Sequence, residues 1–431
     1  MVTNTIPFVK KLAKPILIFL LLIGCHQFSY ASKTYIDTVG VNRYRGIVLD
    51  SKHKKPLIFA SITVNGTNIS TVTNSQGKFL LKIPKKINSQ HITVSFLGYT
   101  SKVINLKNLE NKNNVIKLDT YIEELSEVKI ITKDALSLVK EALKRRGENY
   151  FNDDTNMTAF YRETIKKRRT YVSLSEAVVE IHKQPYNTSR SDLLKLYKSR
   201  KSTDYRKLDT IALKLRGGPF STLHLDIMKN PHLIFTENMD QIYTFTFDKS
   251  TKIDNRPIYV INFKQKSSVS EPFFYGKLYI DAQSLALTSA KFKVNLDNPE
   301  KAGKLFILKK PRKANVIPIE ASYQVNYKVT NNKWYYGYSR IQLGFKVDYD
   351  KKLFNSVYYS TIEMAITNWE KNTTNKSIKL KDRLKSSVIM SDEASGFEDA
   401  EFWGEYNVIE PEKPIEAAIK KIQKQLKRNK T

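Results

Sequence analysis

Cysteine is almost absent from this 431-residue chain, where Cys25 is the only one, and histidine is scarce at six residues. A single cysteine excludes a disulfide framework and a cysteine-based metal site. No histidine begins an H-x-x-E or H-E-x-x-H pattern, the spacings that bring two ligands to a catalytic zinc. No G-x-S-x-G, phosphate-binding glycine loop or dinucleotide fingerprint occurs either. The sequence therefore predicts a protein that is not an enzyme and has no cofactor and no metal, with an enzyme of unrecognised class as an alternative.

Long apolar runs are also lacking, with one exception near the N-terminus. Residues 15–24 (PILIFLLLIG) are apolar and follow Lys10, Lys11 and Lys14. The run is too short to span a bilayer comfortably and has the charged flank of a secretory signal peptide. We therefore expect a signal peptide over residues 1–31, and an exported protein in the periplasm or at the outer membrane of a Gram-negative bacterium.

Two cleavage sites are compatible with this segment. Residues 29–31 (SYA) have the small-x-small pattern of ordinary signal peptidase, whereas residues 22–25 (LIGC) resemble the lipobox of bacterial lipoproteins. The first alternative discards Cys25, and the second makes Cys25 a possible lipidation site and membrane anchor. Both remain open from the sequence.

Acidic residues are outnumbered, with 72 Lys and Arg against 42 Asp and Glu and a formal net charge of +30. Such a charge favours anionic partners. The basic residues are spread along the chain without a recognisable nucleic-acid module, so nucleic acid is an unlikely partner. We expect an envelope protein or a membrane surface as the partner, with an apolar ligand as a further possibility.

Residues 41–120 alternate apolar and polar side chains in short runs separated by turn formers. Seven such runs lie between Tyr44 and Leu118. Short strands at this spacing are typical of an antiparallel β-sandwich.

Spaced motifs within this region resemble the carboxypeptidase-like regulatory domain, a transthyretin-like β-sandwich. They are G-x-V-x-D, the stretch from Pro56 to Thr67, T-x-x-x-G-x-F-x-L and S-F-x-G-Y. In metallocarboxypeptidases such a domain accompanies a separate catalytic domain, so the resemblance implies no activity here. We interpret the motif residues as structural: Gly46, Asp50, Pro56, Gly66, Gly77, Phe79, Gly98 and Tyr99. Gly77 is expected to supply the positive φ of a tight hairpin, and Gly98 to leave room for the ring of Tyr99.

Residues 121–150 are predicted to form a linker and an amphipathic helix. Residues 121–131 resemble the segment that follows this domain in TonB-dependent outer-membrane receptors. The helix is expected over residues 134–146, capped by Asp134 and stopped by Gly147.

Residues 151–390 are predicted to form a second, larger β-rich region. Residues 171–181 alternate, and seven further strand candidates follow residue 240, whereas the basic residues 186–216 indicate a loop or a helix. The long strands in meander order favour one curved antiparallel β-sheet domain with a few helices. Residues 276–287 are similar to repeats in periplasmic lipoprotein-carrier half-barrels, which wrap an apolar ligand. The fold class expected of the whole chain is mainly β.

Carboxylate pairs in this region do not indicate a catalytic site. Alternation places Glu176 and Glu180 on one face of a sheet, and Arg162 with Glu163 indicates a structural ion pair or a loop anchor.

Residues 391–431 form the predicted C-terminal tail, whose residues 414–431 have the spacing of a basic amphipathic helix. This helix would lie on an anionic membrane or dock on the sheet. The whole chain, with A-F-Y-R-E at residues 159–163, resembles uncharacterised envelope proteins named for their first domain. The leading hypothesis is a binding or scaffold protein, and the alternatives are a lipid or lipoprotein carrier and an enzyme of unrecognised class.

Overall fold

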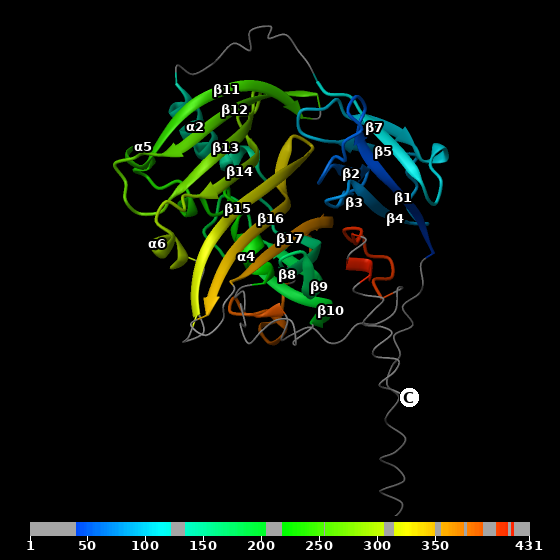
Figure 1. Ribbon diagram of the computed structural model, residues 1–431. Helices are drawn as coiled ribbons and strands as arrows, with labels where there is room; N and C mark the ends of the chain where they lie inside the picture. Colours follow the sequence, from blue (N-terminus) through cyan, green and yellow to red (C-terminus); the bar gives the residue numbers. More distant parts are fainter. Residues whose placement is uncertain are drawn as a thin grey trace, which may run out of the picture. The chain divides into compact units, whose positions relative to one another are not determined.

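The computed structural model describes residues 40–121, 134–203, 218–253, 255–305, 314–349, 355–374, 377–390, 402–412 and 415–417. Residues Val41–Thr431 form one compact unit, and its described part is mainly β (Figure 1). The predicted signal peptide and Cys25, most of residues 121–133 and most of the predicted C-terminal helix lie outside the described residues.

The N-terminal β-sandwich has two sheets, with strand orders β4-β1-β7 and β3-β2-β5-β6. All pairs are antiparallel except β1 with β7. Each of the seven predicted strands overlaps one of these: β1 (Val41–Asp50), β2 (Ser61–Val64), β3 (Ser70–Val72), β4 (Lys78–Pro84), β5 (His91–Ser95), β6 (Lys102–Asn105) and β7 (Asn114–Leu118). The inward side chains, such as Val48, Ile62 and Phe79, fill the space between the two sheets.

The helix after the sandwich begins as predicted but does not end as predicted. The side chain of Asp134 accepts a hydrogen bond from the Ser137 amide at 2.8 Å and caps α2 (Ala135–Lys144). The chain then continues directly into α3 (Arg146–Asn149), which contains Gly147. Gly147 does not take the positive φ that terminates a helix, so its prediction as the stop is wrong.

The second region is a single antiparallel sheet of ten strands in the order β10-β9-β8-β17-β16-β15-β14-β13-β12-β11. A meander from β11 to β17 is followed by β8, which pairs with β17, so the first three strands of the region extend the sheet beyond its last strand. The strands are long and strongly curved (Figure 1). Their bounds are β8 (Thr155–Lys167), β9 (Thr170–Lys183), β10 (Leu193–Thr203), β11 (Tyr243–Ile253), β12 (Arg256–Gln265), β13 (Phe274–Asp281), β14 (Leu287–Val294), β15 (Ala314–Thr330), β16 (Lys333–Tyr349) and β17 (Ser356–Lys371).

Strand β10 lies inside the segment of residues 186–216 predicted as a loop or helix, so that prediction is wrong for Leu193–Thr203. Residues 186–192 do form a loop, and residues 204–216 lie outside the described residues. Leu194 is fully buried, and Leu196 packs against the core, whereas Lys195 and Lys198 alternate with them. Lysine side chains are a common feature of edge strands, where they discourage pairing with another chain. Besides these lysines, a register shift between Leu196 and Lys198 interrupts the two-residue period of this strand.

One face of the ten-stranded sheet carries the main apolar core. Side chains such as Phe263, Leu278 and Ile366 pack there against α2 and against residues 219–242. We call this surface the apolar face. The remaining short helices are η2 (Leu106–Asn108), α4 (Pro219–His224), η3 (Pro231–Leu233), α5 (Met239–Ile242), α6 (Pro299–Gly303) and η4 (Leu380–Asp382).

The sandwich packs on the opposite face of the sheet, which we call the docking face. Phe59, Val72 and Leu80 of the sandwich share one buried cluster with Phe160 and Tyr338 of the sheet. Hydrogen bonds accompany this contact, among them Asn68 Nδ2 to Trp369 O at 2.8 Å, Ser70 Oγ to Ile366 O at 3.1 Å, and Gly98 N to Lys252 O at 2.9 Å.

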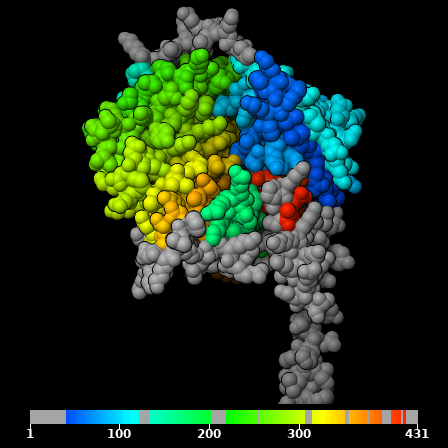
Figure 2. Space-filling model, in the orientation of Figure 1, coloured from blue at the N-terminus to red at the C-terminus, as the bar shows by residue number. Residues whose placement is uncertain are grey.

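Residues 402–412, which we call the C-terminal segment, lie against both the sandwich and the sheet. Trp403, Val408 and Ile409 belong to the same buried cluster. Asn407 accepts from the amide of Lys82 at 2.7 Å and donates to its carbonyl at 2.9 Å, as a neighbouring strand would. Figure 2 shows part of this segment in red beside the blue sandwich.

Candidate binding groove

A row of polar side chains crosses the docking face from one edge of the ten-stranded sheet to the other. Strand pairing places one residue of each strand directly opposite the next, and every residue in the row is polar. From β11 to β10 the row reads Thr246, Asn262, Lys277, Lys291, Gln324, Arg340, Glu363, Arg162, Glu176 and Arg200. We call it the polar row.

The half of the polar row near β10 is buried and its charges alternate. Glu176 is fully buried between Arg162 and Arg200, each at 2.7 Å from one of its carboxylate oxygens. Glu363 lies 3.6 Å from Arg162. Burial raises the pKa of Glu176, but the two guanidinium groups outweigh it and hold that pKa below its usual value. This half of the row is thus internally neutralised.

The C-terminal segment completes this buried half. Arg162 donates to the carbonyl of Ile409 at 2.6 Å, and the guanidinium of Arg200 lies 4.8 Å from the ring centroid of Trp403. Tyr171 donates to Glu412 at 3.0 Å. Because these partners come from the segment itself, the buried charges position it on the sheet.

The other half of the row is not neutralised in the same way. Lys277 and Lys291 stand directly opposite each other on β13 and β14. Asp248 pairs with Lys277 at 2.6 Å, whereas no ion pair within the described residues involves Lys291. The surrounding protein lowers the pKa of Lys291 by desolvation. Two opposed lysines with one paired carboxylate leave this half with excess positive charge. Like charges in directly opposed positions also destabilise a sheet.

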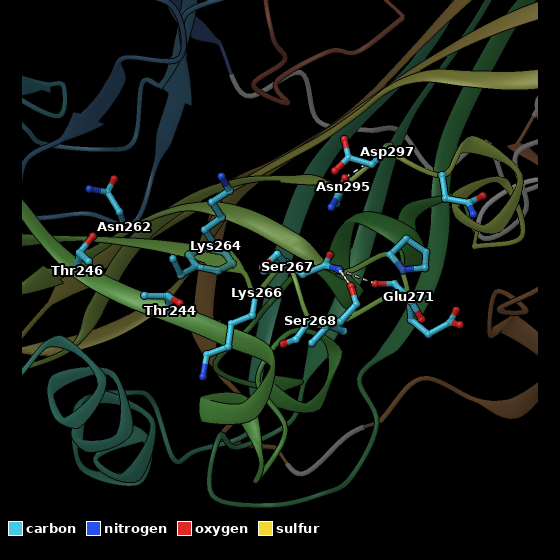
Figure 3. Close-up of a pocket in the computed structure, with 16 residues that line it drawn as sticks. Thr244, Thr246, Asn262, Lys264, Lys266, Ser267, Ser268, Glu271, Asn295 and Asp297 are labelled. Carbon is cyan, nitrogen blue, oxygen red and sulfur yellow. Dashed lines mark hydrogen bonds between the residues drawn. The ribbon is translucent and has the colours of Figure 1, made fainter.

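Cavities along the docking face form a continuous polar groove beside the row. The cavity at its outer end has a volume of about 970 Å³, and Figure 3 shows Thr244, Asn262 and Lys264 along its wall. Gln265 fixes another wall by donating to the carbonyls of Val269 and Glu271, at 2.7 and 2.8 Å. Adjacent cavities share lining residues in sequence along the groove: Lys264 and Asn295, then Tyr275 and Lys293, then Phe59, Lys291 and Gln324.

The inner end of the groove lies where the sandwich meets the sheet. Its two cavities measure about 280 and 410 Å³ and have Phe59 in common. Figure 2 shows the surface hollowed between the blue sandwich and the yellow strands. Phe59 has φ 65°, an unfavourable backbone conformation for a bulky residue, and its ring stacks on Tyr338 at 4.9 Å. The packing of the sandwich on the sheet therefore holds this ring at the end of the groove.

The residues interpreted as the structural motif all lie in the sandwich, outside the polar row. A Cβ on Gly46 would lie 2.5 Å from the carbonyl of Asn114, and Gly77 takes the expected positive φ of 73°. Gly66 also has positive φ, and Pro56 forms a bridge with Leu49.

The four remaining motif residues are Phe79, Tyr99, Asp50 and Gly98. Phe79 is fully buried, and Tyr99 donates to the buried Asp50 at 2.8 Å. Gly98 was expected to leave room for the ring of Tyr99, but a Cβ at this position would meet only Thr251, at 3.5 Å. Glycine is required here because the backbone takes a φ of 84°.

The predicted ion pair of Arg162 with Glu163 does not form. Adjacent residues of a strand point to opposite faces, so Arg162 joins the polar row while Glu163 is buried under the apolar face. Tyr161 donates to Glu163 at 2.8 Å. Burial raises the pKa of Glu163 to about 7.

Sequence analysis found Arg162 and Glu176 but not the row that joins them. No sequence pattern singled out Lys291, Lys293 or Arg340 as site residues, because lysine and arginine are abundant throughout this chain. Within the described ranges, no group of three His, Cys, Asp or Glu side chains is placed to hold a metal ion. No helix of the described part is long and apolar enough to cross a membrane.

Comparisons with known proteins identify the class of the N-terminal unit. Residues 44–130 match the family model of the CarboxypepD_reg-like domain. The sandwich is therefore a CarboxypepD_reg-like domain, as its motifs predicted, and the larger sheet lies outside the match. No curated protein matches the chain.

Seven chains of solved structures have partial likeness to this chain, among them the following three. A DUF1329 family protein from Desulfovibrio piger shares 10% identity at a TM-score of 0.25, covering 57% of this chain and 96% of its own. A LolA superfamily protein from Nitrosomonas europaea shares 11% at 0.20, covering 60% and 100%. Lipovitellin, in a structure concerned with its lipid–protein interactions, shares 10% at 0.28, covering 54% and 27%. With TM-scores below 0.5, none of them establishes a shared fold or function.

Proposed function

We propose that this chain is an exported, non-enzymatic binding protein of the cell envelope, and that the polar groove is its binding surface. The observation that carries the proposal is the division of the polar row. Its buried half is neutralised by the protein's own carboxylates, whereas the half along the groove keeps Lys291, which has no ion pair among the residues that the structure describes. A surface with uncompensated charge beside concave walls is suited to a ligand.

The CarboxypepD_reg-like domain contributes to the groove as a fixed wall. Phe59, Ser61 and Phe96 line the inner cavity together with residues of β14, β15 and β16. Since the sandwich is held by a shared apolar cluster and by hydrogen bonds, this wall is preorganised.

A carrier of an apolar ligand is the second candidate function. Its support is the aromatic cluster of Phe235, Tyr243, Phe245 and Phe263 on the apolar face. However, α2 and residues 219–242 pack against that face, so a lipid would have to displace them. Displacement of a hydrophobic probe by lipids would support the carrier, and unchanged probe fluorescence would argue against it.

Photo-crosslinking in intact cells tests the groove as the binding surface. A photoreactive phenylalanine analogue would replace Tyr275, which lines the groove and is 42% exposed. The matched control is Tyr359, which is 38% exposed and lies outside the groove. We expect a discrete adduct from position 275 that position 359 does not give. The same adducts, or none, from both positions would contradict the proposal.

Cell fractionation tests the location and the anchor. We expect the protein in the envelope fraction, and a Cys25→Ala variant shows whether lipidation retains it there. A soluble variant would establish the lipoprotein alternative, whereas unchanged retention would exclude lipidation as the anchor. Recovery of the unprocessed chain in the cytoplasm would contradict export.

A further inference from the structure

Basic residues of β13, β14 and β16 lie close together at and beside the inner end of the groove. Lys277 and Lys291 are opposed on β13 and β14, and Lys293 lies two residues from Lys291 on the same face. Gln324 separates Lys291 from Arg340 across β15. Asp248 pairs with Lys277, and Glu363 lies opposite Arg340 and interacts with its charge, whereas Lys291 makes no ion pair among the described residues.

Acidic side chains are missing from the lining of the two inner cavities. Among the described residues that line them, the charged ones are Lys291, Lys293, Lys328 and Arg340, and none is Asp or Glu. Lys328 donates to Ser70 at 2.7 Å and so has a partner in the sandwich. The nearest carboxylate of the row is Glu363, opposite Arg340, and it also lies 3.6 Å from Arg162.

Arg340 has the features of a preorganised anion-binding group. Its guanidinium lies 4.6 Å from the ring centroid of Phe59, and its Nε is buried without a hydrogen-bond partner in the described structure. A buried N–H without a partner is costly and is expected to be satisfied by a ligand or by water. A planar guanidinium fixed on an aromatic ring matches carboxylate and phosphate geometry.

The remaining lining of the inner end is suited to sugar hydroxyl groups. Gln324, Gln342 and Ser322 provide amide and hydroxyl groups that both donate and accept hydrogen bonds. Tyr275 adds a half-exposed ring, a flat apolar surface with a polar hydroxyl at its edge. A bare anion would need the cations but not these groups.

We propose that the inner end of the groove binds a saccharide that carries carboxylate or phosphate groups. Lys291, Lys293 and Arg340 contact the anionic groups, and Gln324, Gln342 and Tyr275 contact the sugar. This inference rests on the proposed function and specifies its ligand. The saccharide is either a free acidic glycan or the head of a glycolipid, and the two share the same recognition chemistry.

Isothermal titration calorimetry on the full mature chain tests the ligand class. The probes are hexagalacturonate, a phosphorylated oligomannoside and neutral maltohexaose. We expect at least one anionic probe to bind at least tenfold more tightly than maltohexaose, and its affinity to fall with added salt because the contacts are ionic. Attaching the same saccharide to a lipid in phosphatidylcholine vesicles distinguishes the two sources, since a headgroup ligand binds more tightly there than free in solution.

Three variants locate the site. Lys291→Gln with Lys293→Gln is expected to weaken anionic binding at least tenfold, and Arg340→Lys to weaken it although the charge is kept, because the planar fork is lost. Lys117→Gln, an exposed lysine on β7, is the control and should change nothing. Unchanged thermal unfolding of each variant shows that folding is intact.

Three results would overturn the inference. The first is that neutral and anionic probes bind equally well. The second is that the lysine and arginine variants bind the anionic probe as tightly as the native protein does. The third is that no saccharide binds. Binding to phosphatidylglycerol vesicles that carry no saccharide, lost in the double variant while no saccharide binds, would instead assign the cations to a membrane surface. A discrete adduct at position 275 in cells would still support the groove as the binding surface in each of these cases.

Discussion

Glu176 is the residue on which the buried half of the polar row depends. It is the only carboxylate that contacts both Arg162 and Arg200 among the described residues, and it is fully buried. A Glu176→Gln change keeps the shape of the side chain but removes the negative charge that the two buried guanidinium groups share, although Glu363 remains 3.6 Å from Arg162. We expect a loss of about 3–5 kcal/mol in the free energy of unfolding, measured by urea denaturation.

Glu180 on the same strand provides the matched control. Its carboxylate lies 3.3 Å from Lys195, but both side chains are about two-fifths exposed. A Glu180→Gln change is expected to cost about 0–1 kcal/mol. Similar losses from the two changes would show that the polar row has no special part in stability.

Glu163 makes stability depend on pH in the direction opposite to that of a paired carboxylate. Its folded-state pKa of about 7 is above its ordinary value of 4.5, so the folded protein binds the proton more tightly than the unfolded chain. This contribution is complete below pH 4.5 and is lost as the pH rises through about 7, with a span on the order of 3 kcal/mol. Urea denaturation between pH 4.5 and 8 measures it.

Glu163→Gln isolates this contribution, because glutamine cannot ionise. The difference in unfolding free energy between the native protein and the variant should change with pH over this window. A difference that stays constant would show that Glu163 ionises normally in the folded protein.

At the level of elements, the C-terminal segment acts as a clamp on an edge strand of the sandwich. The two hydrogen bonds from Asn407 to the backbone of Lys82 stand in for a strand beside β4. An Asn407→Ala change leaves both backbone groups without this partner and should cost about 1–3 kcal/mol. Hydrogen exchange measures it directly, because the amide of Lys82 should exchange faster in the variant.

The opposite edge of β4 is the internal reference for that experiment. Amides of β4 that pair with β1 keep their partners in the variant and should exchange as before. Faster exchange throughout β4 would mean that the whole sandwich has loosened.

The elements themselves were largely predictable from the sequence, whereas their alignment was not. Two-residue alternation identified the sandwich and the strands from β11 to β17 because one face of each is apolar. Strand β10 was missed because it is rich in lysine and because a register shift between Leu196 and Lys198 interrupts that period. The polar row depends on nine strand pairings in register, and no local pattern specifies those pairings. Arg162 and Glu176 were therefore visible as residues but not as partners.

At the scale of the whole molecule, the sandwich and the ten-stranded sheet are expected to unfold together. Phe59, Val72 and Leu80 bury their side chains only against the sheet and the C-terminal segment. Separating the two units would expose this cluster at roughly 25 cal/mol per Å² of apolar surface. Calorimetry should show a single transition whose van't Hoff and calorimetric enthalpies agree. Two resolved transitions would show that the sandwich folds independently.

The division of the polar row into a neutralised half and a ligand-binding half is the central claim, and lysine labelling tests it most directly. An amine-reactive acylating reagent would be applied to intact cells and to the purified protein, and mass spectrometry would quantify each lysine. Lys291 and Lys117 are both exposed, so both should be labelled in the purified protein, and the desolvation that lowers the pKa of Lys291 favours its reactive neutral amine. In cells, bound ligand should slow labelling of Lys291 and Lys293 several-fold while Lys117 is unchanged. Lys117 is the control for reagent access, and its labelling should be the same in cells and in the purified protein. If Lys291 is then also labelled equally in both, the claim is contradicted.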